Sequence, residues 1–289
     1  MPTALEKMLD LLDLEVIELN LFRGRSPEED RHRVFGGQVL GQALAAAYST
    51  VEDRLAHSFH AYFLRPGDVS VPILYEVDRI RDGGSFTTRR VVAIQHGRPI
   101  FNLSASFQTD EKGYEHQAPM PDAPSPDELP TSEETRLEMR KQAPPEMSEW
   151  FDREHAIEER AANPINWFKP EKQEPYQRIW FRTNGPVPDS PAVQQAVLAY
   201  ASDMSLLDAT TMPHGISFFD DDMQIASLDH AMWFHRPFRV DEWLLYVSDS
   251  PSASNSRGLS RGSIYSQDGS LIASVAQEGL IRSRRMARS

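Results

Sequence analysis

Two stretches of the chain share one pattern, and this repetition is what most constrains the fold. The first is His60-Ala-Tyr-Phe-Leu-Arg-Pro66, and the second is His230-Ala-Met-Trp-Phe-His-Arg-Pro237. Aligning their Arg-Pro pairs gives an offset that also superposes Arg90 on Arg261. A long period with only two copies is typical of a duplicated domain, because solenoids use short periods and several copies. We therefore expect two similar halves, of which one can keep a functional site while the other loses it.

Length and charge exclude several classes of protein. A chain of 289 residues suits two domains of ordinary size, and no segment is long and apolar enough to span a membrane. The absence of cysteine excludes disulfides, thiolate metal sites and a cysteine nucleophile. The net charge of −13 disfavours binding to nucleic acid or to an anionic membrane. A polyanionic substrate would therefore need a local basic patch.

The two ends of the chain indicate the compartment. The N-terminal residues lack the basic, then apolar, then small-residue order of a secretory signal. The last residues, Met286-Ala-Arg-Ser289, are a poor match to a peroxisomal Ser-Lys-Leu signal. We therefore expect a cytoplasmic protein.

The first half, residues 1–110, reads as helix followed by strands. Leucine and valine at helical spacing predict a short amphipathic helix over 4–19, and an almost wholly apolar stretch predicts a buried helix over 34–48. Gly36 and Gly37 at the start of the second helix indicate a close backbone approach to another group. Strands are predicted at 57–65, 71–80, 85–96 and 99–108, separated by glycine turns.

Residues 111–175 are rich in proline and acidic side chains. The run Met120-Pro-Asp-Ala-Pro-Ser-Pro126 cannot form a regular element, although part of 131–142 could be a charged, solvated helix. We expect this stretch to be a solvated linker between the halves.

The second half, residues 176–289, repeats the order of the first. A strand over 176–183 precedes a helix with Ser190 or Asp189 as N-cap and Pro191 as its first residue, running to about Leu207. Further strands are predicted at 223–236, 242–249, 256–267 and 270–281. The fold class is therefore α+β, with two tandem repeats of a long helix against an antiparallel sheet. The two sheets could join edge to edge, which would hide one edge of each.

Asp203 is an acid on an otherwise apolar helix face. Ala196, Ala199 and Tyr200 precede it at helical spacing and share that face. A buried carboxylate is costly unless it is hydrogen-bonded, and the matching helix over 34–48 contains no acid. This asymmetry is expected of one functional and one lost site. The alternative is an acid at a helix end that reaches water or caps a loop.

Two other polar residues lie within apolar strands of the same half. Ser227 follows Ile225-Ala, and Gln277 lies in the segment from Ala273 to Glu278. Both side chains can donate and accept hydrogen bonds. The alternative is that each is an ordinary hydrogen-bonded polar group in the core. Asp229 lies on the same strand face as Ser227 and is therefore a rival acid.

Other chemistries find little support in the sequence. No histidine pair has metal-binding spacing on a helix, and His230 and His235 lie on opposite faces of one strand. The Gly-x-Ser-x-Gly elbow and the P-loop are both absent. The residues therefore do not indicate a metal site on a helix, a serine nucleophile elbow or a P-loop.

Several segments, taken together and in this order, are distinctive. They are Val34-Phe-Gly-Gly-Gln38, His57-Ser-Phe-His-Ala-Tyr-Phe-Leu-Arg-Pro-Gly67, Asp82-Gly-Gly-Ser-Phe86, Tyr200-Ala-Ser-Asp203, Leu228-Asp-His-Ala-Met-Trp-Phe-His-Arg-Pro237 and Gln277-Glu-Gly279. They resemble the bacterial acyl-CoA thioesterase II family. The similarity extends from about residue 5 to residue 282 and is weakest across 125–175.

This resemblance implies a double hotdog fold and hydrolysis of fatty acyl-CoA by a directly attacking water, with no metal and no cofactor. It also implies that an Asp, a Thr and a Gln hold that water, and these positions map onto Asp203, Ser227 and Gln277. Serine at 227 departs from the family pattern, since it keeps the hydroxyl and loses the methyl group. We expect a homo-oligomer, either dimer or tetramer. Two other hypotheses remain open, an enoyl-CoA hydratase and a non-catalytic acyl-CoA binding protein.

Overall fold

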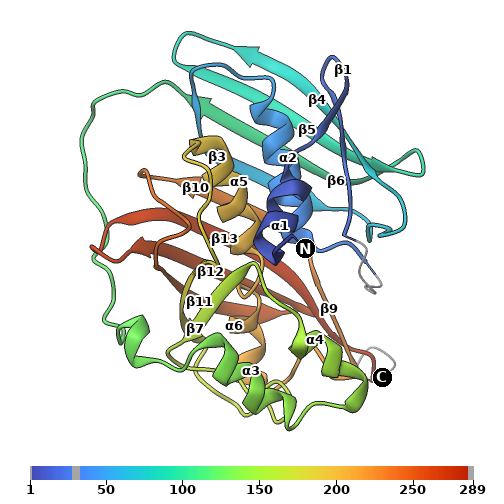
Figure 1. The fold of residues 1–289 in the computed structure, drawn as a ribbon, viewed down its shortest axis with the longest axis vertical. Coiled ribbons are helices and arrows are strands. Elements are labelled where there is room, and N and C mark those ends of the chain that lie inside the picture. The colour runs from blue at the N-terminus through green and yellow to red at the C-terminus, as the bar shows by residue number, and fades with distance from the viewer. Residues whose placement is uncertain (1, 28–32, 286–289) are drawn as a thin grey trace.

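The computed structural model describes residues 2–27 and 33–285, and thirteen strands of this part form one sheet (Figure 1). The order along the sheet is β1-β2-β4-β5-β6-β3-β10-β13-β12-β11-β8-β7, and β9 pairs with β13 beside this path. The first half contributes α1 (Ala4–Leu12), β1 (Glu15–Glu18), β2 (Leu21–Gly24), α2 (Gly36–Tyr48), β3 (Leu55–Phe63), β4 (Ile73–Asp82), β5 (Phe86–Gln95) and β6 (Arg98–Gln108).

The second half repeats the order of a long helix followed by antiparallel strands, with additional short elements directly after the helix. Its elements are β8 (Tyr176–Thr183), α5 (Pro191–Ser202), α6 (Asp208–Thr211), the 3-10 turn η3 (Met212–His214), β9 (Met223–Ser227), β10 (Asp229–Phe234), β11 (Leu244–Ser254), β12 (Arg257–Ser266) and β13 (Leu271–Ser283). Ser190 is the N-cap of α5 and Pro191 its first residue, as predicted. The α+β arrangement of two similar halves is confirmed.

Antiparallel pairing of β3 with β10 joins the two halves of the sheet edge to edge. The pairs run from Asp229 opposite Tyr62 to Trp233 opposite Ser58. Each of these strands would otherwise present a free edge, so the junction satisfies both. The expected edge-to-edge union is therefore present, and it brings the two repeated sequence motifs side by side.

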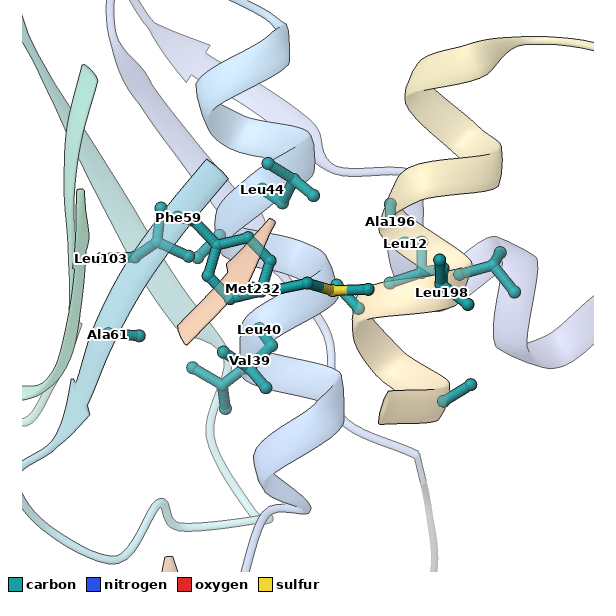
Figure 2. Packing of buried hydrophobic residues seen from close by; sticks show 14 of the residues in the cluster. Leu12, Val39, Leu40, Leu44, Phe59, Ala61, Leu103, Ala196, Leu198 and Met232 are labelled. Carbon is teal, nitrogen blue, oxygen red and sulfur yellow. The ribbon is translucent and has the colours of Figure 1, made fainter. Parts of the chain in front are cut away.

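One hydrophobic core serves both halves. Figure 2 shows Met232 of β10 between Phe59 of β3 and the helices, with Leu40 of α2 and Leu198 of α5 in the same cluster. All four side chains are fully buried. The helices α2 and α5 pack directly on each other, because glycines on α2 allow their backbones to approach. The core therefore positions the end of α5 against the start of α2.

The first predicted helix is wrong in its length. Residues 4–19 do not form one helix, since α1 ends at Leu12 and residues 15–18 form β1. Leu5, Met8 and Leu12 are buried at helical spacing, whereas Val16 is 69% exposed. Pairing with β2 therefore determines the conformation beyond Leu12, at the outer edge of the sheet.

Two further boundaries differ in the second half. The helix predicted to reach Leu207 ends at Ser202, and a separate short helix, α6, begins at Asp208. The strand predicted over 223–236 is divided at Leu228 into β9 and β10, which both pair with β13. The backbone amide of Leu228 donates to Glu278 O at 2.9 Å, which holds the break in place.

Residues 111–175, which were predicted to be a solvated linker, are solvated only in part. It contains η1 (Pro126–Glu128), α3 (Ser132–Arg140), η2 (Pro145–Met147), α4 (Ser148–Asp152) and β7 (Ile157–Ala161). Residues 111–119 are exposed as expected. For residues 157–161 the prediction is wrong, because β7 extends the sheet beside β8. The repeat boundaries at 110 and 176 stay a prediction.

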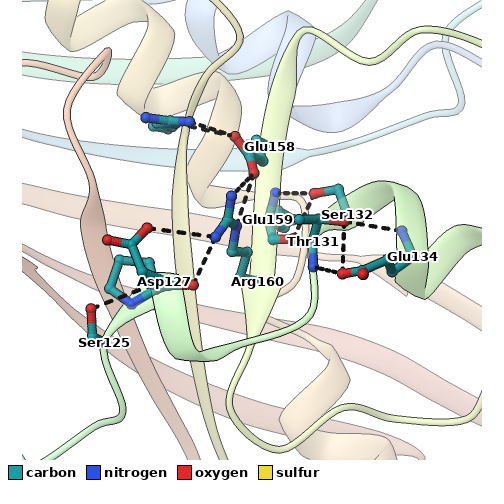
Figure 3. A network of polar contacts seen from close by, with 10 residues as sticks. Ser125, Asp127, Thr131, Ser132, Glu134, Glu158, Glu159 and Arg160 are labelled. Carbon is teal, nitrogen blue, oxygen red and sulfur yellow. Dashed lines mark hydrogen bonds and ion pairs between the residues drawn. The ribbon is translucent and has the colours of Figure 1, made fainter.

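Polar contacts fasten β7 to its surroundings (Figure 3). The Glu158 carboxylate forms ion pairs with Arg160 at 2.7 Å and with Arg182 of β8 at 2.9 Å. On α3, the Ser132 hydroxyl accepts from the Glu159 amide at 2.8 Å and donates to Glu159 O at 2.6 Å. Arg182 and Ser132 are more than 20 residues from their partners on β7 in sequence, which explains why the acidic composition suggested a solvated stretch.

Candidate active site

The three residues singled out in the sequence meet at the end of α5. Asp203 is the C-cap residue of that helix, and its side chain is 4% exposed. Its Oδ1 accepts a hydrogen bond from Gln277 Nε2 at 2.8 Å and another from Ser227 Oγ at 3.4 Å. The carboxylate therefore comes from a helix, the hydroxyl from the end of β9 and the amide from β13.

The first half completes the surroundings of this carboxylate. A Cβ built on Gly36 would lie 2.5 Å from Asp203 Oδ2, so only glycine leaves room there. The Gly37 backbone amide hydrogen-bonds the carboxylate. Phe35, the N-cap of α2, supplies no side-chain cap, and the first amides of a helix have no intrahelical acceptor. Asp203 thus caps the positive end of α2, which explains the close approach predicted for the glycine pair.

The environment adjusts the pKa of Asp203. Burial raises it to about 6, although hydrogen bonds from Gln277, Ser227 and Gly37 and the positive charge of Arg33 act in the opposite direction. A carboxyl group with a pKa near neutrality suits a general base, because it is ionised at pH 7 and still accepts a proton readily.

Asp203 and Ser227 open onto a cavity of about 670 Å³. Its walls come from both halves and are mainly apolar, with side chains that include Val39, Phe63, Phe101, Met204, Leu207 and Ile225. Arg33 and Arg65 also line it, together with Asp208. Gln277, 1% exposed, lies behind Asp203 and not in the cavity wall.

Comparisons with known proteins agree on one family. The family model for acyl-CoA thioesterases matches residues 147–280, and the model for the N-terminal domain of acyl-CoA thioesterases matches residues 25–108. Acyl-CoA thioesterase 2 of Haemophilus influenzae is 44% identical over 98% of this chain and 99% of its own length. The chain belongs to the acyl-CoA thioesterase family. Its class of activity is therefore that of a hydrolase.

Solved structures of related proteins agree with this assignment. The crystal structure of acyl-CoA thioesterase II TesB2 from Mycobacterium marinum matches with a TM-score of 0.79 and 43% identity, over 96% of this chain and 98% of that one. A protein with a hot dog fold from Alicyclobacillus acidocaldarius matches with a TM-score of 0.77 at 20% identity, over 96% and 98% of the two chains. The double hotdog architecture of this thioesterase is confirmed. Neither the hydratase nor the non-catalytic hypothesis fits this family.

Asp229, the rival acid, has a different place in this thioesterase. Its Oδ1 accepts from the backbone amide of Glu278 at 2.7 Å, and it is not among the described residues that line the cavity. Burial raises its pKa, and the nearby Glu278 charge acts in the same direction. Asp229 therefore holds β10 to β13 at the point where the strand is divided.

His230 is a residue of the site that sequence reasoning considered only as a metal ligand. It is fully buried, with Nδ1 3.2 Å from Gln277 Oε1 and Nε2 3.0 Å from Ser202 Oγ. Aligning the two halves would have revealed it. The sequence offset aligns His230 with Phe59, and the two rings stack on each other in the structure.

Proposed function

We propose that this thioesterase hydrolyses fatty acyl-CoA to free fatty acid and CoA by direct attack of a water held by Asp203, Ser227 and Gln277. The observation that carries the proposal is that the Ser227 and Gln277 side chains both donate to one carboxylate oxygen of Asp203, beside a largely apolar cavity. The cavity suits an acyl chain, and Arg33 and Arg65 at its wall suit the phosphates of the coenzyme.

The Asp203 carboxylate accepts a proton from the water as general base. The water oxygen forms a bond to the thioester carbonyl carbon, and the carbon–sulfur bond then breaks to release the CoA thiolate, which takes up a proton. Ser227 aims the water, and so does the N–H of Gln277 Nε2 that Asp203 does not use, because an amide nitrogen carries two donors. Thiolate is a good leaving group, so a dedicated acid is less necessary.

Negative charge on the carbonyl oxygen needs hydrogen-bond donors. The first turn of α2 supplies backbone amides that have no intrahelical acceptor and lie beside Asp203. The N-terminus of a helix also favours negative charge. This part of the first half is therefore assigned to the oxyanion, while the acid, the hydroxyl and the amide come from the second half.

The remaining expectations belong to the same proposal. No helix among the described residues is long and apolar enough to cross a membrane. A net charge of −13 disfavours nucleic acid as a partner. A cytoplasmic location, a role in fatty acid metabolism and a dimeric or tetrameric assembly remain predictions, to be tested by cell fractionation and by the mass of the protein in solution.

A series of acyl-CoA esters of increasing chain length, assayed by thiol release, tests the proposal. We expect hydrolysis of fatty acyl esters and a fall of two or more orders of magnitude in Asp203→Asn, the usual scale for loss of a general base. Asp229→Asn is the matched control and should keep most of the activity. Near-normal turnover by a folded Asp203→Asn would overturn the assignment of the base.

A further inference from the structure

We infer that His230 is a positioning residue, which determines the direction in which the Gln277 amide faces and thereby keeps the amide nitrogen on Asp203. This inference rests on the proposed role of Asp203 as the base. It concerns a chain of four side chains that ends on that base: Ser202, His230, Gln277 and Asp203.

The direction of each hydrogen bond in this series of four side chains follows from its last member, Asp203. An ionised carboxylate only accepts, so the group on Asp203 Oδ1 at 2.8 Å must be the nitrogen of Gln277. The oxygen of that amide then faces His230 Nδ1 at 3.2 Å. An amide oxygen also only accepts, so Nδ1 must carry the imidazole proton. A histidine fixed in this tautomer is what prevents the amide from turning over.

The other ring nitrogen then needs a donor. His230 Nε2 lies 3.0 Å from Ser202 Oγ, and a neutral imidazole protonated at Nδ1 accepts there. The Ser202 hydroxyl also lies 2.9 Å from Ala199 O, so its single proton has two acceptors within reach. Donation to His230 is the choice that leaves every group in the chain satisfied. Ser202 itself is held through its carbonyl oxygen, which accepts from Tyr246 OH at 3.1 Å.

His230 acts on the base through Gln277 and not directly. Its Nδ1 is 3.9 Å from Asp203 Oδ1, beyond hydrogen-bond distance. Burial lowers the pKa of His230 to about 4, so the ring is neutral while the enzyme works. A neutral relay orients the amide without adding a cation that would make Asp203 a weaker base.

The first half carries no such chain at the matching positions. In β3 and β6, Phe59 lies opposite Ala105. The sequence repeat aligns Phe59 with His230 and, after one residue inserted in the second half, Ala105 with Gln277. Phe59 moreover stacks on the His230 ring, with ring centroids 6.0 Å apart and planes inclined by 20°. The polar chain is therefore specific to the half that holds Asp203, and an aromatic ring from the other half fixes the plane of the imidazole.

Steady-state kinetics of thiol release test the inference. His230→Phe keeps an aromatic ring and removes the donor, and we expect kcat to fall tenfold or more, the usual scale for loss of an orienting partner, with KM changed less than about twofold. His230→Asn restores a neutral donor near Nδ1 and should recover much of the loss. His235→Asn, at an exposed residue directly after β10, is the matched control and should leave activity unchanged.

A double variant separates positioning from general damage. In a Gln277→Ala background, His230→Phe should have little further effect, because the amide it orients is gone. Full additivity of the two effects, or unchanged kcat in a folded His230→Phe, would overturn the inference. Loss of activity in Asp203→Asn alongside either result would show that the proposed function still stands.

A spectroscopic measurement on the unaltered enzyme does not depend on any variant folding. Long-range nitrogen–proton NMR of the histidine rings distinguishes the two tautomers, and the His230 signals are identified by their absence in His230→Asn. We expect His230 to carry its proton on Nδ1. A proton on Nε2 would place an acceptor against the Gln277 oxygen and would contradict the inference.

Discussion

Burial and hydrogen bonding act on the pKa of Asp203 in opposite directions. Burial raises its pKa to about 6, so the charged form needed for catalysis is less stable in the folded protein than in water. Three hydrogen bonds and the positive charge of Arg33 offset part of that penalty. The site therefore keeps a carboxylate that is ionised at pH 7 yet remains a better base than an exposed aspartate.

The pH dependence of kcat/KM should report this residue. We expect activity to be nearly constant above pH 7 and to fall about tenfold per unit well below pH 6, as the carboxylate becomes protonated. Because the folded pKa lies above the ordinary value of 3.8, the contribution of Asp203 to stability increases as pH falls from 7 towards 4. Loss of activity in this range should thus be reversible and occur without unfolding, as followed by circular dichroism. An activity midpoint near pH 4 would contradict the assignment.

Variants of Ser227 test whether its hydroxyl orients the attacking water. Ser227→Ala should lower the rate of thioester hydrolysis by an amount equivalent to about 1–3 kcal/mol, the scale for a missing buried hydrogen bond. Ser227→Thr restores the residue usual in the family and should be nearly neutral, unless the added methyl overpacks the site. The two variants are compared at matched stability. Equal and small effects would show that Ser227 has no part in holding the water.

Among the elements, α2 and α5 meet through backbone rather than through large side chains. A Cβ on Gly41 would lie 2.9 Å from Ala196 O and 2.7 Å from Leu12 Cδ2, and one on Gly37 would overlap the Tyr200 carbonyl oxygen. These contacts place the first turn of α2 on Asp203. The distance between the two helices is therefore part of the geometry of the site.

Gly41→Ala should accordingly destabilise the protein. Alanine favours a helix by about 1 kcal/mol over glycine, but overpacking between the helices should cost about 1–3 kcal/mol and exceed that gain. Urea unfolding measures the difference. Gly84→Ala is the control, because a Cβ there meets no atom within 4 Å. A more stable Gly41→Ala variant would show that the helices have room to separate.

Local patterns in the sequence predicted the elements better than their ends. The buried helix over 34–48 and the lone acid at Asp203 followed from periodicity and composition. The end of α5 was not predicted correctly. Leu206 and Leu207 continue the apolar pattern of the helix, although both lie beyond its last residue, Ser202. The division at Leu228 depends on pairing with β13, a contact distant in sequence. Such long-range contacts also explain why β7 and His230 were missed.

For the whole molecule, the shared core predicts that the halves unfold together. Met232 belongs to the second half but packs among side chains of the first. Met232→Ala should lower the free energy of unfolding by about 2–5 kcal/mol in one transition. Hydrogen exchange should then accelerate in β5 as much as in β12. Leu259→Ala, a partly exposed position, should change stability by less than about 0.5 kcal/mol. Two separate transitions, with only the second half weakened, would contradict a common core.

Because β3 pairs with β10, one edge of β3 remains unpaired for part of the time during which the chain is synthesised. The strands of the first half are complete once β6 has been synthesised, but β10 follows roughly 120 residues later. At ordinary rates of translation this interval is on the order of 10 s. Throughout it, the edge of β3 has no partner of its own chain, and an unpaired edge is a template for pairing with another copy. Nascent chains on one messenger are therefore exposed to mispairing at this edge, and the hazard ends when β10 leaves the ribosome.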